Sequence, residues 1–63
     1  MKVLDNNNLL DMDEAASLLN IRKSTLYSMC MRREIPVVKL GRLNRFRRQD
    51  LVRWVESHIQ GQN

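Results

Sequence analysis

The sequence has little of several residue types, and each shortage excludes a class of protein. Its single cysteine, Cys30, excludes an internal disulfide, so we expect the fold to hold in a reducing, cytoplasmic setting. Two glycines and one proline argue against a disordered chain. No apolar run approaches the roughly 18 residues of a membrane span, and the first residues lack the apolar stretch of a signal peptide. We therefore expect no membrane partner.

The chain is also short, at 63 residues. A domain of about 60 residues buries only about 60% of its unfolded surface, which leaves a thin core and no deep substrate cavity. Nothing in the sequence resembles a catalytic triad, a cluster of metal ligands or a phosphate-binding loop. We therefore expect no enzymatic activity, no cofactor and no metal.

Positive charge is abundant, and it is concentrated in one stretch. The formal net charge is +4, but residues 1–20 contain one lysine against four carboxylates. Residues 21–53 contain ten cations against two carboxylates. A segment this basic indicates a polyanionic partner, and nucleic acid is the one we expect. The alternative is a solvated basic surface that binds nothing.

Residues 12–19 have the pattern of a first helix. Asp11 is a typical N-cap residue, and Glu14 follows three residues later, as in a capping box. The helical spacing of the apolar residues predicts a buried stripe made of Met12, Ala15, Ala16 and Leu19. The polar residues 1–8 that precede this helix are expected to form a flexible arm.

A second helical pattern covers residues 23–33 after a short interruption. Asn20 suits the left-handed backbone that ends a helix, and Ile21 is expected to fill the space between the two helices. Pro36 is expected to stop the second helix, because the residue before a proline is pushed out of helical space. The apolar face of this second helix consists of Leu26, Met29 and Cys30. Two helices joined by about four residues form a helix-turn-helix.

Extended segments follow at residues 36–40 and 45–47, and they predict a β-hairpin around a turn at residues 41–44. The expected inward side chains are Val38, Leu40 and Phe46. A third helix is expected from Gln49 to His58, ended by Gly61. Its buried face is predicted to contain Leu51, Trp54 and Val55, with Trp54 as the main core residue. The fold class is therefore mostly α with a small β-hairpin, a winged helix-turn-helix domain over residues 9–60.

Short motifs occur along the chain in a characteristic order: Leu9 to Ala16, Ser24 to Tyr27, Ile35-Pro36, Lys39 to Arg42, Arg45 to Arg48, and Asp50-Leu51 with Trp54. Together they resemble the small excisionase-type DNA-binding domains, which are related in fold to the DNA-binding heads of MerR-type regulators. The resemblance implies a recombination directionality factor, or a small regulator of prophage or mobile-element genes. Arg22 departs from the family, which usually has a capping serine there. Leu43-Asn44 also departs from it, near the tip of the wing.

The second helix of a helix-turn-helix lies in the major groove, with its N-terminal residues closest to the bases. The candidate DNA-binding residues on and around this helix are Arg22, Lys23, Ser24, Tyr27, Ser28 and Arg32. The candidates on the wing are Lys39, Arg42, Arg45 and Arg47. Arg42 suits the backbone or a narrow minor groove. Alternatives are that Tyr27 is a core residue, and that Arg45 or Arg47 pairs with a nearby carboxylate.

The chain ends just after the third helix, without the long dimerisation helix of full MerR-type regulators. We therefore expect a monomer in solution that assembles cooperatively on DNA, with an integrase or recombinase as a further partner. Two alternatives stay open: a small transcriptional regulator, and a protein-interaction module that does not bind DNA. Few aromatic residues are present to stack bases, which argues against a single-strand or RNA binder.

Overall fold

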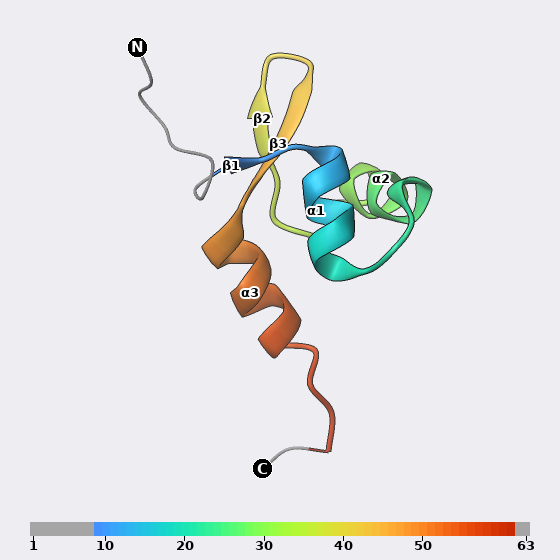
Figure 1. The fold of residues 1–63 in the computed structure, drawn as a ribbon, viewed down its shortest axis with the longest axis vertical. Helices are drawn as coiled ribbons and strands as arrows, with labels where there is room; N and C mark the ends of the chain where they lie inside the picture. Colours follow the sequence, from blue (N-terminus) through green and yellow to red (C-terminus); the bar gives the residue numbers. More distant parts are fainter. Residues whose placement is uncertain (1–8, 62–63) are drawn as a thin grey trace.

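The computed structural model describes residues 9–61, which form three helices and a three-stranded sheet (Figure 1). In chain order the elements are β1 (Leu9–Leu10), α1 (Met12–Leu19), α2 (Lys23–Met31), β2 (Val38–Leu40), β3 (Leu43–Arg47) and α3 (Arg48–Glu56). No helix in this range is long and apolar enough to cross a membrane. The winged helix-turn-helix fold is confirmed, whereas the arm predicted at residues 1–8 lies outside the described residues.

α1 has the bounds that the sequence predicts, because local signals fix both of its ends. The Glu14 N–H donates to Asp11 Oδ1 at 2.8 Å, and the Asp11 N–H donates to Glu14 Oε1 at 3.0 Å, which completes a capping box. At the other end Asn20 has a left-handed φ of 57°, and the Ile21 N–H donates to the Ala16 carbonyl at 3.0 Å. This hydrogen bond is that of a Schellman turn.

α2 ends earlier than the sequence predicted. Arg33 has a left-handed φ of 58° and lies outside the helix. Its N–H donates to the Cys30 carbonyl at 3.1 Å, and the Glu34 N–H donates to the Met29 carbonyl at 2.9 Å. These two bonds form a second Schellman turn. α2 therefore ends at the turn around Arg33, before the chain reaches the position where Pro36 disfavours a helical backbone.

The sheet has the strand order β1-β3-β2, and both pairs are antiparallel. Leu10 lies opposite Phe46, and Leu40 lies opposite Leu43, so only two residues form the loop of the β2–β3 hairpin. Gly41 is the first of them and has a φ of +63°, the sign that a type II′ turn requires at that position. β1 was not predicted, since two residues are too few to show an alternating pattern.

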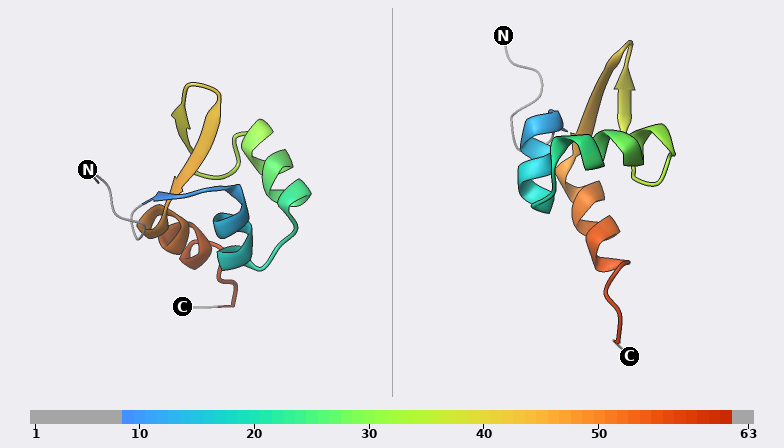
Figure 2. Two further views of the ribbon diagram at one scale, coloured as in Figure 1. Left: turned by 45° about the horizontal axis from the view of Figure 1, so that its top comes forward. Right: turned by 90° about the vertical axis from the view of Figure 1, so that its right-hand side faces the viewer.

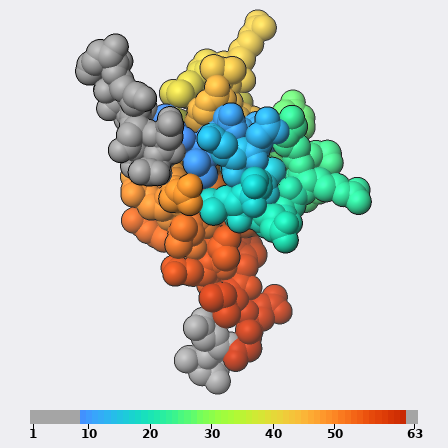
Figure 3. All heavy atoms as spheres, in the orientation of Figure 1, coloured from blue at the N-terminus to red at the C-terminus, as the bar shows by residue number. Residues whose placement is uncertain are grey.

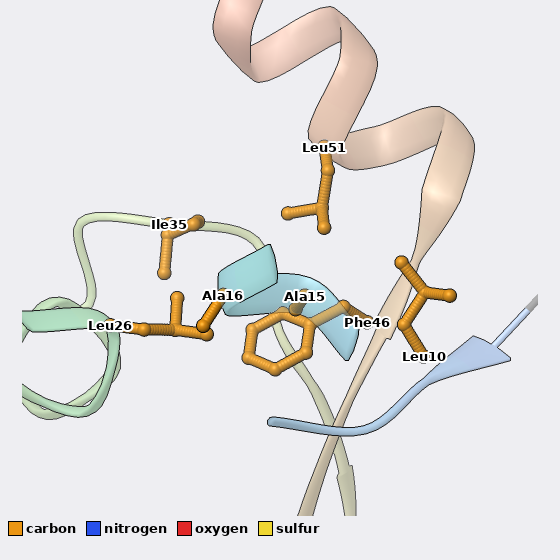
Figure 4. Close-up of a cluster of buried hydrophobic side chains, with 7 residues drawn as sticks. All are labelled: Leu10, Ala15, Ala16, Leu26, Ile35, Phe46 and Leu51. Carbon is orange, nitrogen blue, oxygen red and sulfur yellow. The ribbon is translucent and has the colours of Figure 1, made fainter. Parts of the chain in front are cut away.

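The core lies where β3 crosses α1 (Figure 4). The Phe46 ring is fully buried beside Ala15 and Ala16, whose small side chains let the strand approach the helix closely. The buried hydrophobic residues are Leu10, Ala15, Ala16, Leu26, Ile35, Phe46 and Leu51. All elements except β2 contribute to this core.

The side chains that line the hairpin and α3 differ from the prediction in several places. Leu40 is 48% exposed, because β2 packs mainly on β3. Val38 is half-buried, and Val55 is 44% exposed. Trp54 is half-buried at the edge of the core, where its Nε1–H donates to the Glu34 carbonyl at 2.9 Å. An indole with a polar atom suits such an edge better than the centre of a core.

α3 also ends earlier than expected, at Glu56 rather than His58. The Ser57 hydroxyl donates to the Trp54 carbonyl at 2.6 Å, and His58 Nδ1 lies 2.7 Å from the same oxygen. Side chains that bind the last carbonyls compete with continuation of a helix. The end of α3 is therefore set by these residues and not by Gly61.

Candidate nucleic-acid interface

The exposed face of α2 carries polar and cationic side chains at helical spacing. Leu26 is fully buried on the opposite face, which fixes the orientation of the helix. Tyr27 is 54% exposed, so it is not a core residue. The predicted DNA-contacting residues on this helix are all exposed: Lys23, Ser24, Tyr27 and Ser28. They form a surface of hydroxyl and ammonium groups that can contact base edges and phosphates.

The N-terminal end of α2 is also cationic. Arg22 is the N-cap residue and makes no capping hydrogen bond through its side chain. Lys23 Nζ lies 3.1 Å from Asp13 Oδ1 of α1, and the two side chains are 60% and 75% exposed. An exposed pair of this kind contributes only about 0.2–1 kcal/mol. Lys23 can therefore exchange the carboxylate for a phosphate at little cost.

The hairpin presents a second group of polar side chains. Arg42 is exposed at the loop, next to Gly41. Lys39 Nζ donates to Asn44 Oδ1 at 2.9 Å across the β2–β3 pair. Arg45 is half-buried, and its Nη1 donates to the Asn44 carbonyl at 2.8 Å. Arg45 is thus held along the strand, whereas Arg42 is exposed at the end of the hairpin.

Two of the predicted arginines also pair with carboxylates. Arg47 Nε lies 3.8 Å from Asp50 Oδ2, and Arg32 Nε lies 3.1 Å from Glu34 Oε2. The pairing that the sequence offered as an alternative for Arg47 is therefore present. Both arginine side chains keep at least half of their surface exposed, 50% for Arg47 and 64% for Arg32.

α2 and the hairpin lie close together, away from the C-terminal end of α3 (Figure 2). The space-filling view shows the same separation, with the hairpin at one end of the molecule and α3 at the other (Figure 3). The N-terminal end of α2, with Arg22 and Lys23, is farther from the hairpin than the C-terminal end is. The predicted residues therefore form two groups, one along α2 and one on the hairpin.

A groove of about 390 Å³ separates these two groups. Its lining residues are Cys30, Met31, Arg33, Val37, Lys39 and Asn44. The sequence prediction did not place Arg33 or Asn44 in the site. Arg33 reaches the groove because α2 ends in a left-handed turn, and an arginine gives no sequence signal for such a turn. Asn44 lies within the turn that the sequence predicts at residues 41–44, whereas the structure places it in β3.

Cys30 is the one residue of the groove with nucleophilic chemistry, but its environment suppresses that chemistry. Burial raises the pKa of its thiol above the ordinary value, and the nearby Lys39 charge only partly opposes this effect. The thiol therefore stays protonated near neutral pH. In residues 9–61 no three His, Cys, Asp or Glu side chains lie close enough together to hold a metal ion.

A second groove, of about 210 Å³, lies between α1 and α3 and is mainly apolar. Its lining residues are Leu18, Leu19, Leu51, Val52, Val55 and Glu56. It contains no cation and none of the predicted DNA-contacting residues. This groove is therefore distinct from the predicted DNA-contacting surface.

A family model described as "Helix-turn-helix domain" matches residues 9–59. This range runs from β1 to just beyond α3 and includes both groups of predicted residues. No curated protein and no solved structure matches the chain significantly.

Proposed function

We propose a function from one premise: the chain belongs to the helix-turn-helix domain family, which confirms its resemblance to excisionase-type DNA-binding domains. The protein binds double-stranded DNA at specific sites through residues 9–60 and catalyses no reaction. α2 lies in the major groove, and the hairpin lies on the backbone or in the adjacent minor groove. The proposed contacts are Arg22, Lys23, Ser24, Tyr27, Ser28, Arg32, Lys39, Arg42, Arg45 and Arg47.

The observation that carries this proposal is the exposed face of α2. An aromatic ring that is 54% exposed, on the same face as two serines and a lysine, has no role in the core of so small a domain. A tyrosine, hydroxyls and an ammonium are the groups that read base edges and position a phosphate. Arg42 adds a cation at the end of the neighbouring hairpin.

The test is a titration of a fluorescently labelled mixed-sequence duplex with the protein, followed by anisotropy at several salt concentrations. We expect the logarithm of affinity to fall with the logarithm of salt concentration, with a slope of about −0.9 for each phosphate neutralised. Absence of binding at low salt would overturn the proposal. The protein-interaction module would then be the function to pursue.

Arg42→Ala is expected to weaken DNA binding and to reduce the salt slope by about 0.9, because it removes one phosphate or minor-groove contact. The matched control is Arg53→Ala, which removes an exposed arginine from α3. It should leave affinity unchanged, since α3 lies away from the hairpin loop. Equal effects of the two substitutions would show that only net charge matters and that the hairpin makes no contact.

The biological role that we propose is the one suggested by the resemblance. The protein acts as a recombination directionality factor of a prophage or mobile element, in the cytoplasm, with an integrase or recombinase as its partner. It is a monomer in solution and assembles cooperatively on DNA. A selection for the preferred site followed by footprinting tests this role, because protection of an attachment site supports it. Protection of a promoter alone would favour the small transcriptional regulator, and sedimentation of the free protein checks the monomer.

A further inference from the structure

Arg33 has a backbone conformation that an arginine rarely adopts. Its φ of 58° is left-handed, and two hydrogen bonds of the turn after α2 hold it there. In this region the Cβ atom crowds the following carbonyl, so glycine or asparagine usually occupies the position. The equivalent turn after α1 has Asn20, with a φ of 57°. The turn after α2 thus keeps a large cation where a smaller residue would be less strained.

No ion pair within the described residues accounts for this cation. No carboxylate of residues 9–61 lies within 4 Å of the Arg33 guanidinium, and the adjacent Glu34 is bound to Arg32 at 3.1 Å. Arg33 lines the groove between α2 and the hairpin together with Lys39. No acidic residue lines this groove, so two positive charges face an open and uncompensated space.

The position of the groove matches the path of a DNA strand. Where one element lies in the major groove and another lies in the adjacent minor groove, one sugar–phosphate strand runs between them. Met31 lines the groove and is 67% exposed. It lies one helical turn beyond Tyr27 on the exposed face of α2. The sugar–phosphate strand that runs from the exposed face of α2 toward the hairpin therefore crosses the groove.

We propose that Arg33 and Lys39 together bind a phosphate of the DNA strand that passes between α2 and the hairpin. This inference rests on the proposed DNA binding and adds to it a contact that holds the two DNA-binding elements in register on the duplex. The strained conformation of Arg33 is retained because it places this arginine at the groove. Strain that persists at a binding surface is typical of functional residues.

The test is the substitution Arg33→Gly, which changes stability and binding in opposite directions. Glycine adopts the left-handed conformation without strain, so the melting temperature should rise by a few degrees. Loss of a charge-assisted contact should weaken binding to the mixed-sequence duplex by about tenfold. The salt slope should become shallower by about 0.9. A destabilised fold cannot explain a loss of binding in a variant that is more stable.

Two further variants of the full chain serve as controls. Asn20→Gly makes the same kind of change at the other left-handed turn and should leave affinity and salt slope unchanged. Arg33→Lys keeps the charge and should retain the parent's salt slope. If Arg33→Gly binds like the parent, or if it melts below the parent, the inference is wrong while the proposed function stands. If the parent itself does not bind the duplex, both are wrong.

Discussion

Single side chains set the ends of the two helices of the helix-turn-helix, and they do so in different ways. Asp11 and Glu14 close the start of α1 with reciprocal hydrogen bonds. Arg22 starts α2 without a side-chain cap, so the first N–H groups of α2 have no such acceptor. A cation at this end is unfavourable for the helix dipole. It becomes favourable when a phosphate binds beside it.

At this scale we predict that Asp11→Ala lowers the free energy of unfolding by about 1 kcal/mol, because it removes the cap of α1. Urea denaturation followed by circular dichroism measures the change. The control is Asp13→Ala in the same turn, where the carboxylate forms only the exposed pair with Lys23. It should cost less than about 0.5 kcal/mol. Equal losses would show that Asp11 acts through its charge and not as a cap.

At the scale of elements, the prediction from sequence succeeded where the signals are local. The bounds of α1 follow from Asp11 and Asn20, since both residue types are characteristic of helix ends. The end of α2 did not follow, because Arg33 is not a residue type that marks a left-handed turn. Leu40 was predicted to face inward from its apolar character alone. Its exposure depends on which element lies behind β2, and the sequence does not contain that information locally.

α3 illustrates the same distinction between pattern and packing. Leu51 is fully buried, whereas its neighbour Val52 is 45% exposed. Trp54 was predicted to be the main core residue, yet Phe46, Leu26 and Leu51 fill that role. Periodicity indicated which face of α3 is apolar. It did not show that the face extends beyond the core into the groove beside α1.

We predict that Leu51→Ala costs about 2–5 kcal/mol of stability, because it leaves a cavity in the core. Val52→Ala is the matched control on the same turn and should change stability by less than about 0.5 kcal/mol. Thermal melts of both variants, followed by circular dichroism, make the comparison. A similar loss for both would mean that α3 packs with a different face.

At the scale of the whole molecule, the sheet joins parts that are distant in sequence. β1 lies at the start of the domain and pairs with β3 more than thirty residues later, at Leu9 with Arg47 and Leu10 with Phe46. Pairing over this separation leaves no local signal. The groove between α2 and the hairpin is a product of the same long-range packing. The sequence therefore predicts which cations are candidates for DNA binding, but not how they are grouped in space.

Leu10→Ala tests this long-range connection. Leu10 is 3% exposed and packs in the core beside Phe46, so truncation should cost about 2–5 kcal/mol. A core this small supplies only about 3–5 kcal/mol, so the variant should be partly unfolded at room temperature. Circular dichroism against temperature measures this. A cooperative melt close to that of the parent would show that β1 is dispensable.

β3 runs into α3 without a loop, since Arg47 ends the strand and Arg48 begins the helix. The rotation of α3 about its own axis is therefore fixed relative to β3. Each residue of an α-helix turns the chain by about 100°, so one residue gained or lost here would rotate every side chain of α3 by that angle. The stretch from Arg32 to Val37 separates α2 from β2, so it does not fix the rotation of one element relative to the other in this way. Changes in length across relatives should therefore be found in that stretch and be absent from the β3–α3 junction.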